Sequence, residues 1–217
     1  RPGFMTGTKM SLPVGFTRKD DKKWEEVSVP AENKGTGAPD TGKKTVKISS
    51  LDEIGQMAFR GIKQLNPIQS TVFETAYNTS ENMLVCAPTG AGKTNVAMLT
   101  IIQCIKQNIE SGVIKRDKFK IVYVAPMKAL AAEMTAGFGK RLEPLGITVK
   151  ELTGDMSLTK TEIANTQMLV TTPEKWDVVT RKQGGGGGGD SMGSLASRCR
   201  LLIVDEIHLL AEERGAV

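Results

Sequence analysis

The 217-residue sequence has few of the features that extracellular or membrane-spanning proteins depend on. Its three cysteines, Cys86, Cys104 and Cys199, are dispersed and odd in number, so a disulfide framework is not expected. No apolar run is long enough to span a bilayer, and no charged-then-apolar signal pattern is present. We therefore expect a protein without membrane contacts that works in the nucleus or the cytosol.

The charge balance is equally modest. Lysine and arginine exceed aspartate and glutamate by 29 to 24, which gives a net charge of +5. This excess is compatible with a polyanionic partner, but many ordinary proteins are as basic. Charge alone therefore does not identify a partner.

The chain changes character near residue 48. Residues 1–47 show little periodicity and contain a mixed charged run, which predicts a linker or a loosely packed extension. Residues 48–217 alternate between short apolar runs and helical patterns, as one α/β domain would. The chain stops at Val217 shortly after an apolar run, so we expect this domain to be incomplete at its C-terminal end.

Local patterns predict two early helices and five strands. A Ser-capped helix is expected within residues 49–59, and Asn66 and Pro67 open a second helix over 66–77. Mostly continuous apolar runs predict strands buried on both faces by helices. These runs are 82–88, 120–126, 148–152, 167–173 and 200–206. The expected fold is a doubly wound parallel sheet, in which ligands bind at the carboxyl ends of the strands.

A phosphate-binding loop follows the first predicted strand. The segment matches G-x-x-x-x-G-K-[ST] except at its first position, and its residues are Ala87, Pro88, Thr89, Gly90, Ala91, Gly92, Lys93 and Thr94. Glycines let backbone N–H groups surround phosphate oxygens, and the next helix directs its positive end at them. Lys93 can reach the β- and γ-phosphates, and the Thr94 hydroxyl can coordinate Mg²⁺. The alternative, a glycine turn that binds nothing, fits this strand–loop–helix context poorly.

Two carboxylates follow the last predicted strand. Asp205 is placed to hold Mg²⁺, and Glu206 to polarise an attacking water. An isolated Asp-Glu pair is more often a solvated turn, but the phosphate loop upstream favours the catalytic interpretation. His208 is the only histidine, and from the residues alone a functional and a structural role are equally plausible.

Several motifs in the same order resemble superfamily-two helicases of the DExH type, in the Ski-type branch. "APTGAGKT" and "DEIH" at 205–208 resemble motifs I and II, and "APMKALAAEM" resembles motif Ia. "TTPEKWD" at 171–177 resembles motif Ib, and "LTGD" at 152–155 resembles motif Ic. The resemblance covers residues 48–217 and implies a RecA-like P-loop NTPase lobe. Taken alone, "MKALAAEM" is more typical of an amphipathic core helix.

The resemblance also implies the roles of single residues. Lys93, Asp205 and Glu206 would be catalytic, Gln69 would read the adenine edge, and His208 would link the nucleotide to the nucleic-acid groove. Contacts to DNA or RNA that do not depend on its sequence are expected from Pro126, Lys128, Thr171, Thr172, Pro173 and Glu174. The complete protein would use ATP and Mg²⁺ to move 3′-to-5′ on a strand, within a multi-subunit complex.

Two departures from the family pattern stand out. The glycine-rich tract 182–197 predicts a flexible surface insertion that does not pack. Motifs III to VI are absent, and with them the second RecA-like lobe and its arginine fingers. Two other functions stay open: a different P-loop ATPase, which an LSGGQ-type or sensor motif would favour, and a nucleic-acid-binding module that has lost hydrolysis. No such motif occurs, and both Lys93 and Glu206 are intact.

Overall fold

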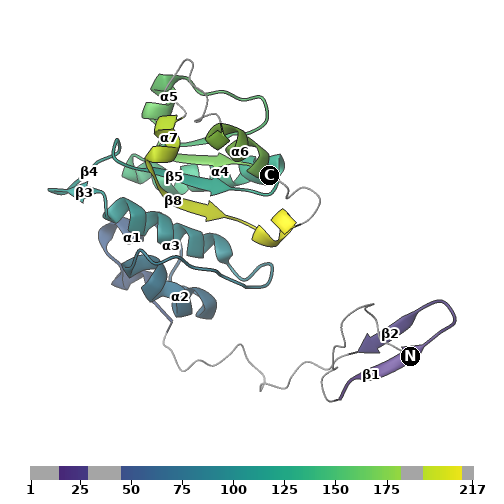
Figure 1. The fold of residues 1–217 in the computed structure, drawn as a ribbon. Coiled ribbons are helices and arrows are strands. Elements are labelled where there is room, and N and C mark those ends of the chain that lie inside the picture. The colour runs from purple at the N-terminus through teal and green to yellow at the C-terminus, as the bar shows by residue number, and fades with distance from the viewer. Residues whose placement is uncertain (1–14, 29–44, 182–192, 212–217) are drawn as a thin grey trace. The chain divides into compact units, whose positions relative to one another are not determined.

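The computed structural model describes residues 15–28, 45–181 and 193–211 (Figure 1). The chain divides into two compact units, residues Arg1–Thr41 and Gly42–Val217. Among the described helices, none is both long enough and apolar enough to cross a membrane.

The first unit contains a hairpin that the sequence patterns did not predict. β1 (Thr17–Asp20) pairs antiparallel with β2 (Glu25–Ser28). Most of its side chains are exposed, so the strands lack the buried face that reveals a strand in sequence. The prediction of a linker or a loosely packed extension over 1–47 did not include this hairpin.

The second unit begins slightly before the predicted boundary at residue 48. The Leu65 N–H donates to the Val46 carbonyl (2.8 Å), and Lys47 forms a β-bridge with Gln64. The unit contains, in chain order and with 3-10 helices written η, η1 (Ile48–Ser50), α1 (Glu53–Ala58), α2 (Pro67–Asn78), α3 (Lys93–Lys106), β3 (Ile109–Glu110), β4 (Val113–Ile114), β5 (Lys120–Val124), α4 (Lys128–Leu142), η2 (Glu143–Leu145), β6 (Val149–Leu152), α5 (Lys160–Ala164), β7 (Met168–Thr171), α6 (Pro173–Arg181), α7 (Gly193–Ser197), β8 (Cys199–Val204) and η4 (Ile207–Ala211).

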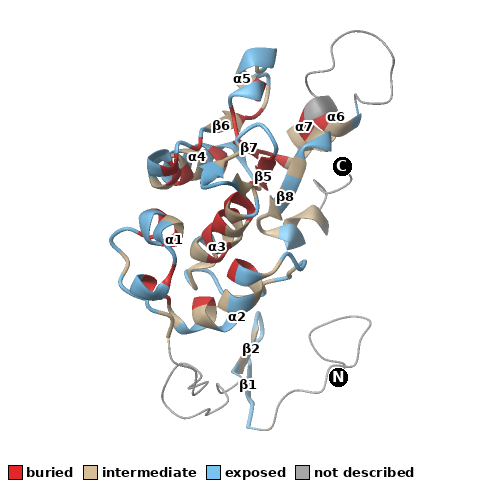
Figure 2. Ribbon diagram, turned by 90° about the vertical axis from the view of Figure 1, so that its left-hand side faces the viewer, coloured by how far each residue is buried: buried red, intermediate tan, exposed pale blue. Residues whose placement is uncertain are grey.

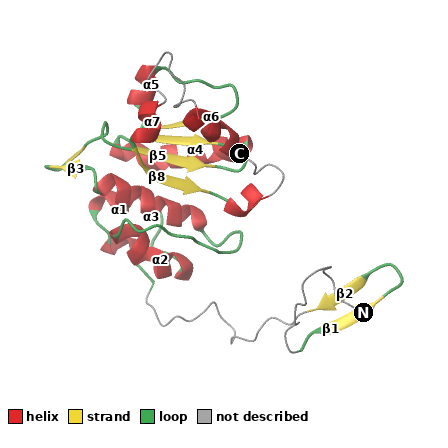
Figure 3. Ribbon diagram, viewed as in Figure 1, coloured by secondary structure: helices red, strands yellow, loops and turns green. Residues whose placement is uncertain are grey.

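A four-stranded parallel sheet in the order β6-β7-β5-β8 forms the centre of this unit (Figure 3). Alternate side chains of β5 point to opposite faces. Ile121 and Tyr123 pack in a core with α1, α3 and α4, whereas Val122 and Val124 pack in a second core with α5, α6 and α7. Helices therefore cover both faces, as Figure 1 shows, and the predicted doubly wound sheet is confirmed. Figure 2 shows the buried face of α3 in red.

The apolar run before the phosphate loop does not form the strand that the sequence predicts. Residues 82–88 form no helix or strand and pair with no strand of the described part, so the sheet has four strands there instead of five. Met83 packs against the core, whereas Leu84 is 75% exposed. Among the described strands, β8 pairs with β5 alone, so this run does not extend the sheet beyond β8.

The prediction that the glycine-rich tract 182–197 does not pack is also partly wrong. Residues 182–192 lie outside the described ranges, but 193–197 form α7. Leu195 of α7 is fully buried in the core with α5 and α6. One well-placed leucine therefore anchors a segment whose glycine content suggested that it would not pack.

The predicted N-cap is confirmed for one of the two early helices and wrong for the other. α2 begins as predicted, with a capping box between Asn66 and Gln69. α1 is capped by Asp52 and not by the predicted serine. The Asp52 carboxylate accepts hydrogen bonds from the Gly55 N–H (2.9 Å) and the Tyr77 hydroxyl (2.8 Å), and lies 2.9 Å from Lys106 Nζ. Partial burial raises the pKa of Asp52, but these partners outweigh it and hold the pKa below its ordinary value.

We expect Asp52→Ala to lower the free energy of unfolding by about 1–2 kcal/mol at pH 7, because it removes a helix cap and leaves Tyr77 without an acceptor. The folded-state pKa is lowered, so the stabilisation is present above the unfolded pKa and is lost as the pH falls through the folded one. The difference in the free energy of unfolding between wild type and variant, measured by urea unfolding, should therefore be smaller at low pH than at pH 7. Glu53→Ala, an exposed neighbour, is the control; an equal loss there would contradict the assignment.

Candidate nucleotide and nucleic-acid site

The phosphate loop leads directly into α3. Gly92 caps the helix with φ at 85°, a left-handed conformation that favours glycine. The apolar face of α3, including Leu99 and Ile102, is buried and fixes the direction in which its N-terminus points. The first turn of α3, which contains Lys93 and Thr94, therefore presents backbone N–H groups where the sequence predicts an anion site.

α2 braces this loop through two side-chain amides. Asn66 Nδ2 donates to the Ala91 carbonyl (2.9 Å), and Gln69 Nε2 donates to the Gly92 carbonyl (3.0 Å). Gln69 Oε1 accepts from the Asn66 N–H (2.9 Å), and the Gln69 side chain is almost fully buried. These two bonds leave one hydrogen and one lone pair of the Gln69 amide unused. The structure shows a loop-bracing role for Gln69 that the sequence did not predict.

Lys93, Glu206 and His208 lie in a row beside the loop. Lys93 Nζ donates to the Ala87 carbonyl (3.0 Å) and lies 3.5 Å from Glu206 Oε1. His208 Nε2 lies 3.4 Å from Glu206 Oε2. Glu206 itself has φ at 49°, an uncommon conformation for a residue with a side chain. The fold therefore brings together the two predicted motifs that are far apart in sequence.

Asp205 is fixed at the end of β8. Its N–H donates to the Val124 carbonyl of β5 (3.0 Å). Its carboxylate accepts from the Glu206 N–H through Oδ1 (3.0 Å) and from the Tyr123 hydroxyl through Oδ2 (2.9 Å). Burial, followed by the charge of Asp205 and this hydrogen bond, raises the pKa of Tyr123 far above its ordinary value.

The donor set at this edge fits Mg²⁺. Asp205 offers a carboxylate and Thr94 an exposed hydroxyl, and oxygen ligands are those that Mg²⁺ prefers. Within the described ranges, no group of three or more His, Cys, Asp or Glu side chains forms a complete metal site. A protein that supplies few ligands suits Mg²⁺ bound together with nucleotide phosphates.

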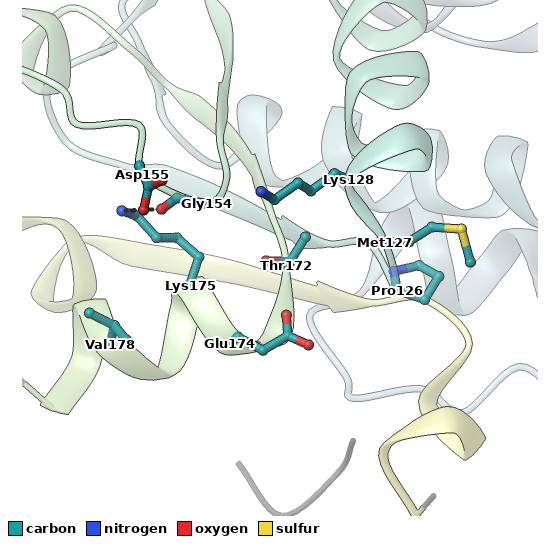
Figure 4. A pocket seen from close by; sticks show the side chains of 9 residues that line it. All are labelled: Pro126, Met127, Lys128, Gly154, Asp155, Thr172, Glu174, Lys175 and Val178. Atoms are coloured by element: carbon teal, nitrogen blue, oxygen red, sulfur yellow. Dashed lines mark hydrogen bonds between the residues drawn. The ribbon is translucent and has the colours of Figure 1, made fainter. Parts of the chain in front are cut away.

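A pocket of about 650 Å³ lies at the carboxyl ends of β5, β6 and β7 (Figure 4). Each strand sends the residues that follow it into this pocket. The lining residues are Pro126, Met127 and Lys128 after β5, Gly154 and Asp155 after β6, and Thr172, Glu174, Lys175 and Val178 after β7. Three segments that the sequence assigned to separate motifs thus form one surface.

Two lysines give this pocket its positive groups. Lys175 Nζ donates to the carbonyls of Gly154 (3.0 Å) and Met156 (2.7 Å), so it closes the loop after β6 onto α6. A Cβ at Gly154 would fall 2.5 Å from Lys128 Nζ, which places this ammonium group directly against the glycine. Figure 4 shows both ammonium groups on the Gly154 side of the pocket.

The predicted nucleic-acid residues do not all reach the pocket. Thr171 is 1% exposed, and its hydroxyl donates to the Leu152 carbonyl of β6 (2.7 Å). This hydrogen bond joins β7 to β6 within the sheet. Pro173 is the first residue of α6 and is absent from the lining. The sequence reasoning missed Lys175, although it lies within the quoted "TTPEKWD" motif. It also missed Tyr123, which gave no signal beyond being a polar residue in an apolar strand.

Comparison with protein families identifies this arrangement. Residues 66–217 match the family model described as DEAD/DEAH box helicase. The chain belongs to this helicase family. The α/β unit is therefore a DEAD/DEAH box helicase domain, and the family resemblance that the motifs indicated is confirmed.

Individual relatives agree with the family. The chain is 62% identical over 216 residues to activating signal cointegrator 1 complex subunit 3 of Homo sapiens, covering 99% of this chain and 9% of the relative. It is 52% identical to the RQC trigger complex helicase SLH1 of Saccharomyces cerevisiae, covering 97% of this chain and 11% of that one. The chain thus spans about a tenth of the length of these relatives.

Solved structures share the fold. The DUF1998 helicase MrfA, bound to DNA and AMPPNP, superposes with a TM-score of 0.59. The match covers 77% of this chain and 22% of MrfA at 23% sequence identity. At this identity the likeness supports the RecA-like architecture alone.

We expect Gly92→Ala to lower nucleotide affinity at least about tenfold, because a Cβ there would fall 2.3 Å from Gln69 Nε2 and break the brace on the loop. Gly61→Ala is the matched control, since Gly61 has a similar φ of 88° but nothing lies within 4 Å of its Cβ position. Both variants should lose about 1–2 kcal/mol to backbone strain. Titration with a fluorescent ATP analogue should show a loss of affinity for Gly92→Ala only; equal affinities would contradict the brace.

Proposed function

We propose that this lobe binds Mg-ATP at the phosphate loop and a single nucleic-acid strand in the pocket beyond β5, and that the complete protein couples hydrolysis to movement along that strand. The observation that supports it is geometric. The Lys93–Glu206 pair, 3.5 Å apart, and the lysine-bearing pocket both lie at the carboxyl edge of one parallel sheet.

On the nucleotide side, each residue has a separate task. The N–H groups of the loop and the ammonium of Lys93 would bind the phosphates, and Thr94 and Asp205 would hold Mg²⁺. Bound there, Mg²⁺ would neutralise developing charge on the phosphates. Glu206, next to Lys93 and His208, would orient the attacking water. The remaining donor and acceptor of Gln69 would read the adenine edge.

On the nucleic-acid side, the pocket suits a backbone more than a base. Ammonium groups and the N-terminus of α6, at Pro173 and Glu174, bind sugar-phosphate without reading sequence. We propose DNA or RNA as the strand, with Pro126, Lys128 and Thr172 among the contacts. Thr171 is excluded from direct contact in this proposal because its hydroxyl is used between strands.

A direct link between the two sites runs through β5. The Asp205 N–H donates to the Val124 carbonyl, and Pro126 at the pocket follows two residues later. His208, paired with Glu206, extends the nucleotide side of this edge. We propose that a second RecA-like lobe supplies arginine fingers across this edge, and that the protein acts within a complex in the nucleus or the cytosol. The free cysteines fit such a reducing compartment.

We expect Lys93→Ala to abolish nucleotide binding and leave the fold intact. Lys93 supplies a charge-assisted contact but little packing, being only half-buried. A fluorescent ATP analogue should bind the wild-type chain and fail to bind the variant, while circular dichroism spectra coincide. A folded variant that keeps wild-type affinity would refute the assignment of the loop.

We expect Lys128→Ala to weaken binding of single-stranded oligonucleotides to a similar extent for all sequences. Because each neutralised phosphate contributes about 0.7 to the salt slope on a single strand, this slope should fall by about that amount. Lys118→Ala is the matched control, since it removes the same charge from an exposed ion pair with Glu110. Fluorescence anisotropy at several salt concentrations measures the affinity and the salt slope of each variant. An equal effect of the two variants would show that only net charge matters.

A further inference from the structure

Packing does not explain why Tyr123 carries a buried hydroxyl in the middle of the sheet. β5 is buried along its whole length, and Tyr123 is only 3% exposed. Its ring packs against Phe138 of α4, with centroids 5.3 Å apart. Phenylalanine would provide this packing without the cost of burying a polar group. The hydroxyl therefore serves the hydrogen bond that it makes within the described ranges.

That partner is the carboxylate proposed to hold Mg²⁺. Tyr123 Oη donates to Asp205 Oδ2 at 2.9 Å, and the Glu206 N–H donates to Asp205 Oδ1 at 3.0 Å. The Asp205 main chain is fixed as well, through its N–H bond to Val124. One donor on each oxygen sets the plane of the carboxylate and leaves further lone pairs on both oxygens.

The Tyr123 hydroxyl approaches Asp205 from within the core. Asp205, at the end of β8, thus has a donor beside Oδ2 that comes from the neighbouring strand β5. The Tyr123 ring packs against Phe138 of α4, and this packing holds the hydroxyl in its place.

We propose that Tyr123 is a positioning residue that orients the Asp205 carboxylate for Mg²⁺. This inference rests on the proposed function, in which Asp205 holds the metal beside the nucleotide phosphates. Partners that orient a metal-binding side chain raise metal affinity without touching the metal. Tyr123 should therefore affect the Mg²⁺ dependence of nucleotide binding, and not the metal-free affinity.

The test is a Tyr123→Phe variant of the chain, titrated with a fluorescent ATP analogue in EDTA and at increasing Mg²⁺. We expect unchanged affinity in EDTA and about a tenfold rise in the Mg²⁺ concentration that gives half of the affinity gain. Tyr77→Phe is the matched control: it is equally buried and also donates to an aspartate, Asp52. It should lower the melting temperature by about 2–4 °C and leave the Mg²⁺ dependence at the wild-type value.

A double-mutant cycle separates positioning from general loosening of the core. In an Asp205→Ala background, Tyr123→Phe should cause no further change in Mg²⁺ dependence, because the carboxylate that it orients is gone. An equal effect in both backgrounds, or wild-type Mg²⁺ dependence of Tyr123→Phe, overturns this inference alone. A wild-type chain that binds no Mg-nucleotide overturns the proposed function together with the inference.

Discussion

The parallel pairing of β5 with β7 and β8 is the constraint on which both candidate sites depend. Because all strands of the sheet run in the same direction, the residues that follow them gather at one edge. β8 delivers Asp205 and Glu206 to the phosphate loop, and β5, β6 and β7 deliver the lining of the pocket. The pairing that places one site thus places the other, with β5 shared by both.

The parts of the fold that the sequence predicted well are those set by local patterns. The strands β5, β7 and β8 lie in mostly apolar runs, and the loop before α3 needs glycine for its left-handed turn. The capping box of α2 is likewise written in consecutive residues. Predictions failed where the outcome depends on a distant partner. The run 82–88 has strand composition but pairs with no strand of the described part, and α7 is held by the burial of Leu195 in a distant core.

The candidate site shows the same division. Motif patterns indicated Lys93, Asp205 and Glu206, which the structure brings together, but they could not show how buried polar groups share their bonds. Burying a hydroxyl or an amide is costly unless it is paired, so such groups take whichever partner the fold provides. Gln69 braces Gly92, and Thr171 bonds to Leu152. Both pairings join segments that are distant in sequence.

The most direct test of the account is amide NMR of the ¹⁵N-labelled chain, titrated with Mg-nucleotide and with a single-stranded oligonucleotide. Nucleotide should shift residues around 66–69, 87–95 and 205–208, and the oligonucleotide those around 126–128, 154–155 and 172–178. Each ligand should still bind when the other is saturating, because the two groups of residues occupy separate stretches of the same sheet edge. Mutual competition, or a single set of shifted residues for both ligands, would contradict the account.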